Sequence, residues 1–390
     1  MSHKMSTWIA TGFGALDISS HTVGGPDAEL LVTGTQAEEP IGLTGAPATL
    51  YRTLVDGPIS EEGLTADEVQ LLREFEDFGL ASKDPHSNHR IDELAVPWFD
   101  SPVHELVCGL VASIAKRDNF DVIFIKGPSL YKQGIREKRH SGDVDVLVAP
   151  EDFSRAISAL EEFGWVRQAA FWDGTGINHS TALSAPINWG CELDIHEYFP
   201  GIGLPATQAF RILKDATHVE TFAGVSSFVP DLEAHSVLYA LHQMRPEFGT
   251  ARSEYLSAGA AKAISIAGDG SYAIAKQLKA DAVLRPLFQL VFPSLDLSQT
   301  GEIPLNWKWR SKDSRVAGYL YALKSLPIST RFRILVQLIW PREELVWQSD
   351  KLAKSRSTTL GQARLARYKR GMKNCLRKRR WSNSPNNVVS

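Results

Sequence analysis

Two aspartates separated by one valine are the residues of this sequence best suited to chemistry. Asp143 and Asp145 lie in Ser-Gly-Asp-Val-Asp-Val-Leu-Val, residues 141–148. Side chains alternate between the faces of a strand, so both carboxylates would project from one face while the valines anchor the other. Adjacent carboxylates repel each other unless a cation lies between them. A Mg²⁺ or Mn²⁺ ion completed by substrate phosphates meets this need; a surface strand with both aspartates in water is the alternative.

The segment just upstream has features that suit phosphate groups. Residues 122–125 (Val-Ile-Phe-Ile) predict a buried strand, and Pro128 predicts a helix that continues to about Glu137. Between them, Gly127 allows a phosphate to approach the backbone, and the helix start offers free N–H groups. Ser129 would add a hydroxyl donor and Lys126 a positive charge. Many α/β proteins have such a strand-glycine-helix junction only for packing. It indicates phosphate binding here because it directly precedes the two aspartates.

A third carboxylate is expected from a later strand, Cys-Glu-Leu-Asp-Ile-His at residues 191–196. Alternation puts Asp194, Glu192 and His196 on one face and the two apolar residues on the other. Three carboxylates could bridge two metal ions that clamp the attacking and leaving oxygens of an in-line displacement, and one carboxylate could act as general base. His196 is interpreted as a polar residue at a strand end rather than as a ligand.

This order of elements resembles the DNA polymerase beta-like nucleotidyltransferase superfamily, which has a strand, a glycine turn, a helix, an Asp-x-Asp strand and a later carboxylate. More narrowly, Lys-Gly-Pro-Ser-Leu-Tyr at 126–131 with the later motifs is similar to an uncharacterised bacterial nucleotidyltransferase family, over roughly residues 100 to 245. Lys-Gly stands here for the usual Gly-Ser. The resemblance implies metal ligands at Asp143, Asp145 and Asp194, and NTP-phosphate contacts at Gly127, Ser129 and Lys126.

Arg139 lies four residues before the first aspartate and could bind a triphosphate, although a solvated loop arginine fits equally well. The base of the NTP and the acceptor are not specified by any motif.

The elements around these motifs predict an α/β (α+β) fold with a nucleotidyltransferase-type mixed sheet. Residues 97–230 alternate helices and strands, and the late strands lack intervening helices, so antiparallel pairing is expected. The predicted helices are 103–117, 128–137 and 151–163, and the predicted strands are 122–125, 144–148, 165–172, 179–184 and 191–196. We expect this region to be the catalytic domain.

The first 94 residues predict a small winged-helix-like module. Strands at 8–10 and 29–32 precede two amphipathic helices, at 44–57 and 65–78, and Thr65 with Glu68 forms a capping box. The pattern resembles a RiPP recognition element, a domain that binds leader peptides of ribosomal-peptide biosynthesis by adding the peptide as a strand. A small packing domain is the simpler interpretation. Residues 82–90 are polar and predict a linker.

Residues 231–350 predict a helical domain, with helices at 231–242, 254–267, 271–279 and 316–323. A basic tail, 351–390, follows: from Lys351 to Arg380 it has many lysines and arginines and no acidic residue. A solvated helix is the simplest interpretation of the tail, and contact with a polyanion is the alternative.

Composition limits the remaining choices. The net charge of −3 makes nucleic acid an unlikely partner for the whole protein. Three widely spaced cysteines form no disulfide framework, and neither a secretory signal nor a membrane-spanning run is evident. A cytoplasmic protein is expected.

Three hypotheses follow. The leading one is a metal-dependent nucleotidyltransferase that moves an NMP group from an NTP to an acceptor, such as a ribosomal peptide or its modified form. The second is a non-catalytic leader-peptide-binding protein with a degenerate transferase fold, and three retained carboxylates argue against it. The third, nucleic-acid extension, depends only on the basic tail.

Overall fold

The computed structural model describes residues 7–20, 28–36, 39–138, 142–170, 172–173, 175–186, 189–249, 254–353 and 357–370. The chain separates into two compact units. The larger comprises residues 1–168 and 179–319, and the smaller comprises residues 169–178 and 320–390. The N-terminal module, the central sheet and the first helices after it therefore belong to the same unit.

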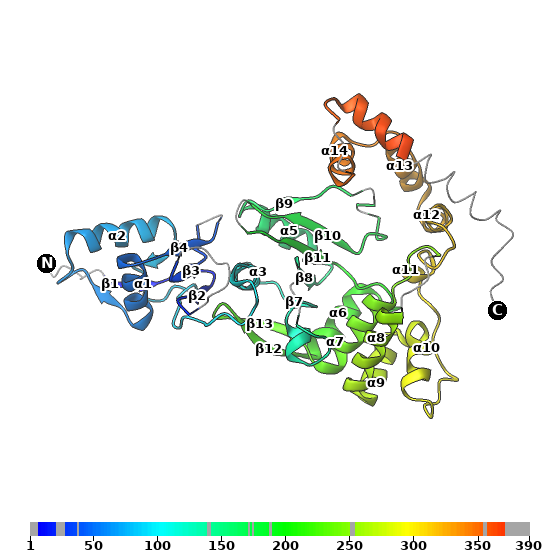
Figure 1. Cartoon of the computed structure of the whole chain (residues 1–390), viewed down its shortest axis with the longest axis horizontal. Coiled ribbons are helices and arrows are strands. Elements are labelled where there is room, and N and C mark those ends of the chain that lie inside the picture. The colour runs from blue at the N-terminus through cyan, green and yellow to red at the C-terminus, as the bar shows by residue number, and fades with distance from the viewer. Residues whose placement is uncertain are drawn as a thin grey trace. The chain divides into compact units, whose positions relative to one another are not determined.

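A seven-stranded mixed sheet forms the centre of the larger unit (Figure 1). Its spatial order is β12-β13-β7-β8-β11-β10-β9. The pairs β13–β7 and β8–β11 are parallel and the others antiparallel. The strands are β7 (Val122–Phe124), β8 (Asp143–Val148), β9 (Val166–Arg167), β10 (Ser180–Ser184), β11 (Glu192–His196), β12 (Thr217–Phe222) and β13 (Val225–Pro230). The mixed α+β fold predicted from the sequence is confirmed.

Helices cover both faces of this sheet, because its strands are apolar on both. Val144, Val146 and Val148 pack on the side of α3 (Pro102–Arg117) and α5 (Phe153–Glu161). Leu147 and Ile123 pack on the opposite side with α6 (Ala206–Asp215), α7 (Leu232–Met244), α8 (Glu254–Ala267), α9 (Asp269–Gln277) and α10 (Asp281–Val291). The paired aspartates of β8 alternate with its valines, so they face the side of α6 and α7.

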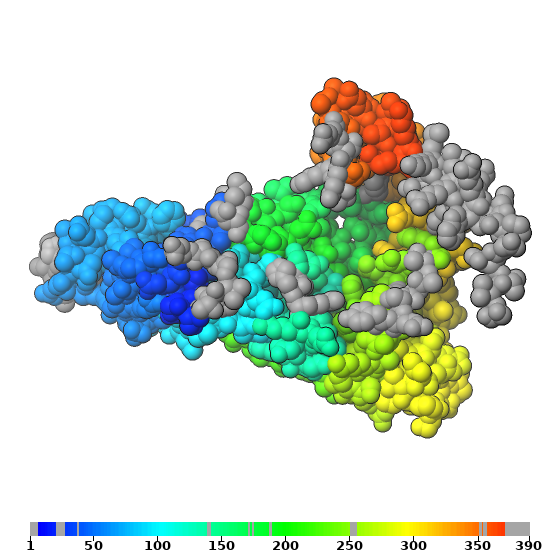
Figure 2. Space-filling model, viewed as in Figure 1, coloured from blue at the N-terminus to red at the C-terminus, as the bar shows by residue number. Residues whose placement is uncertain are grey.

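The helices α7 to α10 pack against one another and form a continuous yellow-green to yellow surface in Figure 2. The short helix α11 (Leu305–Lys308) follows, and its Trp307 is buried in the same core. The chain then enters α12 (Arg315–Lys324), within which the larger unit ends. The smaller unit contains α13 (Ile328–Ile339) and α14 (Glu343–Leu352). In the part of the chain that the structure describes, no helix combines the length and apolarity needed to span a bilayer.

The N-terminal module is built from two small antiparallel sheets and two helices. The first sheet has the order β5-β1-β6 and the second β2-β3-β4. Its elements are β1 (Thr7–Ala10), β2 (Ala15–Asp17), β3 (Leu30–Val32), β4 (Ile41–Leu43), α1 (Ala46–Asp56), β5 (Ile59–Ser60), α2 (Ala66–Asp77) and β6 (Ala81–Ser82). Both predicted helices, the two predicted strands and the capping box at Thr65 are confirmed.

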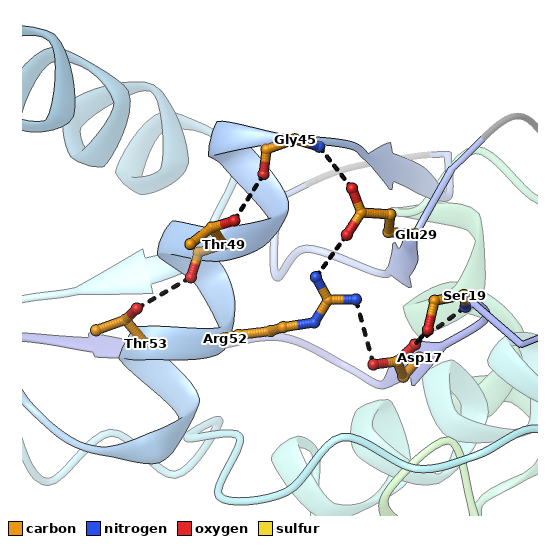
Figure 3. A network of polar contacts seen from close by, with 7 residues as sticks. All are labelled: Asp17, Ser19, Glu29, Gly45, Thr49, Arg52 and Thr53. Carbon is orange, nitrogen blue, oxygen red and sulfur yellow. Dashed lines mark hydrogen bonds and ion pairs between the residues drawn. The ribbon is translucent and has the colours of Figure 1, made fainter.

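A polar network fixes α1 against the second of these sheets (Figure 3). Arg52 of α1 donates to Glu29 at 2.6 Å and to Asp17 of β2 at 3.3 Å. Glu29 also accepts a bond from the backbone N–H of Gly45, at the start of the helix, at 2.8 Å. The Arg52 guanidinium thus links α1 to β2 and to Glu29, the residue preceding β3, and Glu29 in turn bonds to the start of the helix.

Helix α3 connects the module to the large sheet. It is buried along most of its length, because Phe13 and Leu16 of the module pack on it together with the sheet residues. Gly109 allows this approach: a Cβ at this position would lie 3.1 Å from the carbonyl oxygen of Phe13 and 3.2 Å from the Cβ of Ala223. The module and the sheet therefore share one core.

Three expected segments differ in the structure. The helix predicted from 128 to 137 is only α4 (Ser129–Lys132), because Gly134 with φ of 73° turns the chain away. The strand predicted at 165–172 is only the two residues of β9. The predicted linker is bonded back to the module, since the Gly12 N–H donates to the carbonyl of His89 at 2.9 Å. Short strands and the β12–β13 hairpin were not predicted, because two or three residues carry little periodicity.

The capping box predicts a local loss of stability in the variant Thr65→Ala. The Thr65 hydroxyl accepts from the Glu68 N–H at 3.2 Å, and Glu68 accepts from the Thr65 N–H at 2.8 Å. Removing an N-cap of this type costs about 1 kcal/mol. Amide hydrogen exchange should therefore be several-fold faster in the first turn of α2. Thr53→Ala, the same change at an exposed mid-helix position of α1, should leave exchange unchanged or slower, and equal effects at both sites would contradict the assignment.

Candidate functional site

The register of two parallel strands brings the predicted carboxylates together. In the pairing of β8 with β11, Asp145 lies opposite Asp194, and Asp143 lies opposite Glu192. All four project from the same face, as alternation predicts, while Leu193 and the β8 valines lie in the core on the other face. One ligand atom from each of Asp145, Asp194 and His196 lies within 4.8 Å of the others.

Asp145 is the most enclosed of these carboxylates, and two cationic or donor groups converge on it. Its side chain is 3% exposed. Its Oδ1 accepts from Lys126 Nζ at 2.5 Å and from His196 Nε2 at 2.8 Å. Burial alone would raise the pKa of Asp145, but the hydrogen bond from His196 and the charge of Lys126 outweigh it, so that the pKa lies below its ordinary value. Asp145 is therefore a buried carboxylate that stays ionised.

Asp194 is shifted in the opposite direction. Burial raises its pKa and the charge of Asp145 adds to this effect, although His196 and Lys126 oppose it. Neighbouring carboxylates whose pKa values are shifted in opposite directions are a common feature of sites that handle protons or cations.

The donor set fits a divalent cation. Asp145 and Asp194 offer hard carboxylate oxygens in a buried position, Asp143 lies on the same face at the start of β8, and His196 adds a ring nitrogen. Oxygen ligands suit Mg²⁺, and a mixed oxygen and imidazole set also suits Mn²⁺. Lys126 neutralises part of the same carboxylate cluster. A bound cation would take over some of this neutralisation, so the position of the Lys126 side chain should depend on whether an ion is present.

The backbone at Lys126 and Gly127 is unusual. Lys126 has φ of 137° and Gly127 has φ of 73°, both in the region that favours glycine. No atom lies within 4 Å of the place where a Cβ of Gly127 would be, so there is open space beside this turn. A lysine in a glycine-type conformation costs about 1–3 kcal/mol, and such strain is characteristic of functional sites.

The other predicted phosphate contacts are placed less clearly. The Ser129 hydroxyl is buried and donates to Glu220 of β12 at 2.9 Å. The predicted triphosphate contact Arg139 lies outside the described residues. Because α4 has only four residues, the helix dipole expected to support a phosphate is small. Gly127 and Lys126 therefore remain the predicted contacts that lie nearest the carboxylates with open space around them.

A pocket that opens to solvent adjoins the carboxylates. Lys126, Asp143 and Asp145 line one part of it, and aromatic rings line the rest: Trp98, Phe99, Phe124, Tyr131 and Phe222. The rings of Trp98 and Phe222 are stacked with centroids 5.9 Å apart. Phe99, Phe124 and Phe222 are themselves buried, and Lys132 Nζ lies 3.4 Å from the centroid of the Trp98 ring, so these rings form a packed apolar wall beside the aspartates.

Three residues near this site were missed by the sequence reasoning. Arg245 follows α7, Arg310 follows α11, and His179 precedes β10. Arg245 Nη1 donates to His179 Nε2 at 3.0 Å, and the ring centroid of His179 lies 5.4 Å from that of His196. No sequence motif links positions so far apart. The fold brings Arg245 and His179 beside His196 at the end of β11, and the Phe248 N–H donates to the carbonyl of Arg310 at 3.0 Å, which sets the loop of Arg310 against that of Arg245.

Comparisons with protein-family models, with curated proteins and with solved structures found no match. The assignment of this site depends on its own geometry.

The positive φ of Lys126 predicts that glycine will be more stable than methionine at this position, the opposite of the order expected in a helix. Lys126→Gly and Lys126→Met both remove the ion pair with Asp145, but only glycine relieves the positive φ. We expect the glycine variant to be more stable by about 1 kcal/mol. Lys214 in α6 is the control, because it also pairs with an aspartate, Asp121, at 2.5 Å but has helical geometry.

At Lys214 the order should invert, with glycine less stable than methionine by about 1 kcal/mol. Urea denaturation of the four variants measures both differences. If Lys126→Gly has a lower free energy of unfolding than Lys126→Met, the backbone of residue 126 is not strained.

Proposed function

We propose that this protein is a metal-dependent nucleotidyltransferase that transfers an NMP group from an NTP to an acceptor. One observation carries the proposal: the β8–β11 register places Asp145 beside Asp194, with Asp143 on the same face. The resemblance to the DNA polymerase beta-like superfamily supports it, since that pattern has an Asp-x-Asp strand and a third carboxylate on a neighbouring strand. Gly127 and Lys126 lie at the turn where that pattern contacts phosphates.

Asp143, Asp145 and Asp194 would hold the Mg²⁺ or Mn²⁺. The ion would polarise the phosphoryl oxygens and reduce their charge repulsion toward an attacking oxygen. Lys126 would orient the phosphates from the turn beside β7. The open space at Gly127 would accept them without a clash.

The transfer itself is an in-line displacement at the α-phosphorus. The acceptor oxygen forms a bond to this phosphorus while the bond from the phosphorus to the β-phosphate oxygen breaks. Pyrophosphate leaves with the bonding electron pair, and the acceptor proton passes to a nearby carboxylate or to water. Hydroxyl, phosphate and carboxylate acceptors all fit this chemistry.

The carboxylates predict a sharp loss of activity on neutralisation. With an α-³²P-labelled NTP, Mg²⁺ and candidate acceptors, Asp143→Asn, Asp145→Asn and Asp194→Asn should each reduce transfer at least about 10³-fold, because transition-state charge loses its counter-ion. The melting temperature of the wild type should rise with Mn²⁺ plus NTP, and this rise should vanish in the three variants.

The exposed Asp121→Asn serves as the matched control and should behave as wild type. Undiminished labelling by Asp145→Asn would refute the metal assignment. A melting temperature that no combination of ion and NTP changes would favour a non-catalytic binding protein.

A peptide is the partner that the N-terminal module suits best. Within the described residues β4 pairs only with β3, so no described strand occupies its other edge. The opposite edge, at β2, is covered, because the Asp17 N–H donates to the carbonyl of Ala95 at 2.9 Å. An open edge of this kind binds extended peptides by strand addition. We therefore propose that β4 receives the leader of a ribosomal precursor peptide, as the likeness to a RiPP recognition element implies.

Strand addition predicts a local change in hydrogen exchange. With candidate precursor peptides added, the amides of Ile41–Leu43 should exchange more slowly in the full chain, because new backbone hydrogen bonds protect them. The β12 edge of the large sheet is the control and should not change. Asp145→Asn should retain the effect, since the carboxylates lie outside the module. Protection at β12, or none with any peptide, would contradict the proposal.

A further inference from the structure

We propose that Arg245, Arg310 and His179 form an anion site for a phosphoryl group beside the carboxylates. This inference rests on the proposed function and adds an anion site to the proposed cation site. The carboxylates would hold the cation, and the arginines, from the helical part of the same unit, would hold the phosphoryl charge that the cation does not neutralise.

The two arginines lack the partners that half-buried arginines normally have. Within the described part of the chain, neither guanidinium forms an ion pair with a carboxylate. Arg245 donates to the neutral ring nitrogen of His179 at 3.0 Å, and Arg310 lies 4.7 Å from the ring centroid of Trp309. Neutral rings hold the guanidinium groups in place without cancelling their charge.

Arg245 and Arg310 carry positive charge that nearby carboxylates do not balance. Burial lowers the pKa of Arg310 to about 10, and the charge of Arg245 adds to that effect. Burial also lowers the pKa of Arg245, and the attractive charges near it, Glu247 first and then Asp145 and Asp194, do not restore it. Asp145 already accepts bonds from Lys126 and His196. The Phe248 N–H, three residues after Arg245, donates to the carbonyl of Arg310 at 3.0 Å, so the two arginines lie on adjoining loops. Two like charges held near each other and partly shielded from water are costly unless an anion joins them.

The nearby histidines, His179 and His242, are neutral, so they do not share the positive charge of the arginines. Burial and the charges of His196 and Arg245 hold the pKa of His179 well below its ordinary value. Burial, with Lys126 and Arg245, lowers the pKa of His242 to about 3. His179 and His242 therefore add no positive charge near neutral pH, and the two arginines carry the positive charge of this group.

A phosphoryl group matches this arrangement better than a single carboxylate. Planar guanidinium groups donate two parallel bonds to phosphate oxygens, and two of them match a dianion. Arg245 lies 3.0 Å from the ring of His179, that ring lies 5.4 Å from the ring of His196, and His196 bonds to Asp145, so Arg245 is close to the carboxylates. The group could be the β- and γ-phosphates of the NTP or a phosphate on the acceptor, and the two sources can be separated by experiment.

Inorganic pyrophosphate is the direct probe, titrated by calorimetry into the full chain in EDTA, so that neither metal nor reaction is needed. Arg245→Met and Arg310→Met keep most of the side-chain stem and should each weaken binding about 10- to 100-fold. Arg310→Lys should recover only part of the affinity, because lysine lacks the fork. The exposed Arg285→Met on α10 is the control and should bind as wild type.

Folding can be monitored in the same variants. Arg310→Met removes one of two repelling charges, so without anions its melting temperature should equal or exceed that of the wild type, while pyrophosphate should raise only that of the wild type. Equal pyrophosphate affinity in wild type and the double arginine variant, or no binding at all, would overturn the site.

The source of the phosphate follows from nucleotide titrations with Mg²⁺. If the arginine variants weaken ATP but not AMP, the site holds the outer phosphates of the NTP. If ATP is unaffected while pyrophosphate and phosphate binding are lost, the site holds a phosphate of the acceptor. Pyrophosphate binding in a protein without transfer activity would leave this site standing and refute only the proposed transferase.

Discussion

The parallel pairing of β8 with β11 is the constraint on which the rest of the site depends. It places Asp145 directly opposite Asp194 in the buried centre of the sheet, where two negative charges would otherwise repel each other. The fold offsets this cost with Lys126 and His196, both bonded to the same oxygen of Asp145. A one-residue slip of either strand would turn its carboxylates into the valine and leucine core, so the hydrophobic pattern itself holds the charges in register.

Lys126 connects this electrostatic requirement to the backbone. Its side chain reaches Asp145 from a turn that would normally be made by glycine, with φ of 137°. The ion pair and the packing of β7 hold the residue there, and the strain is tolerated because the charge is needed at that point. The same turn keeps Gly127 open to its surroundings. One position therefore has two functions: it neutralises a buried carboxylate and leaves a path for a phosphate.

Sequence reasoning predicted the parts of the fold that alternate regularly and missed those that depend on distant contacts. The faces of β8 and β11 followed from a period of two, and the capping box at Thr65 from spacing alone. The length of α4 could not be predicted, because a glycine turn ends it before its apolar pattern does. Arg245 and Arg310 could not be predicted either, since each is an ordinary loop arginine in the sequence and their two loops meet only in the folded chain.

The helical segment after the sheet therefore contributes more than a cover for its apolar face. Leu238 and Leu241 of α7 bury that face, and the same helix ends where Arg245 reaches His179. Stability and charge placement come from one element, so the helix cannot be shifted without moving the arginine. If the carboxylates define the reaction, then the arginines of these loops and the pocket lined by Asp143 limit the size and charge of whatever is bound. Acceptor specificity should accordingly be sought in the loops after α7 and α11 as well as in the N-terminal module.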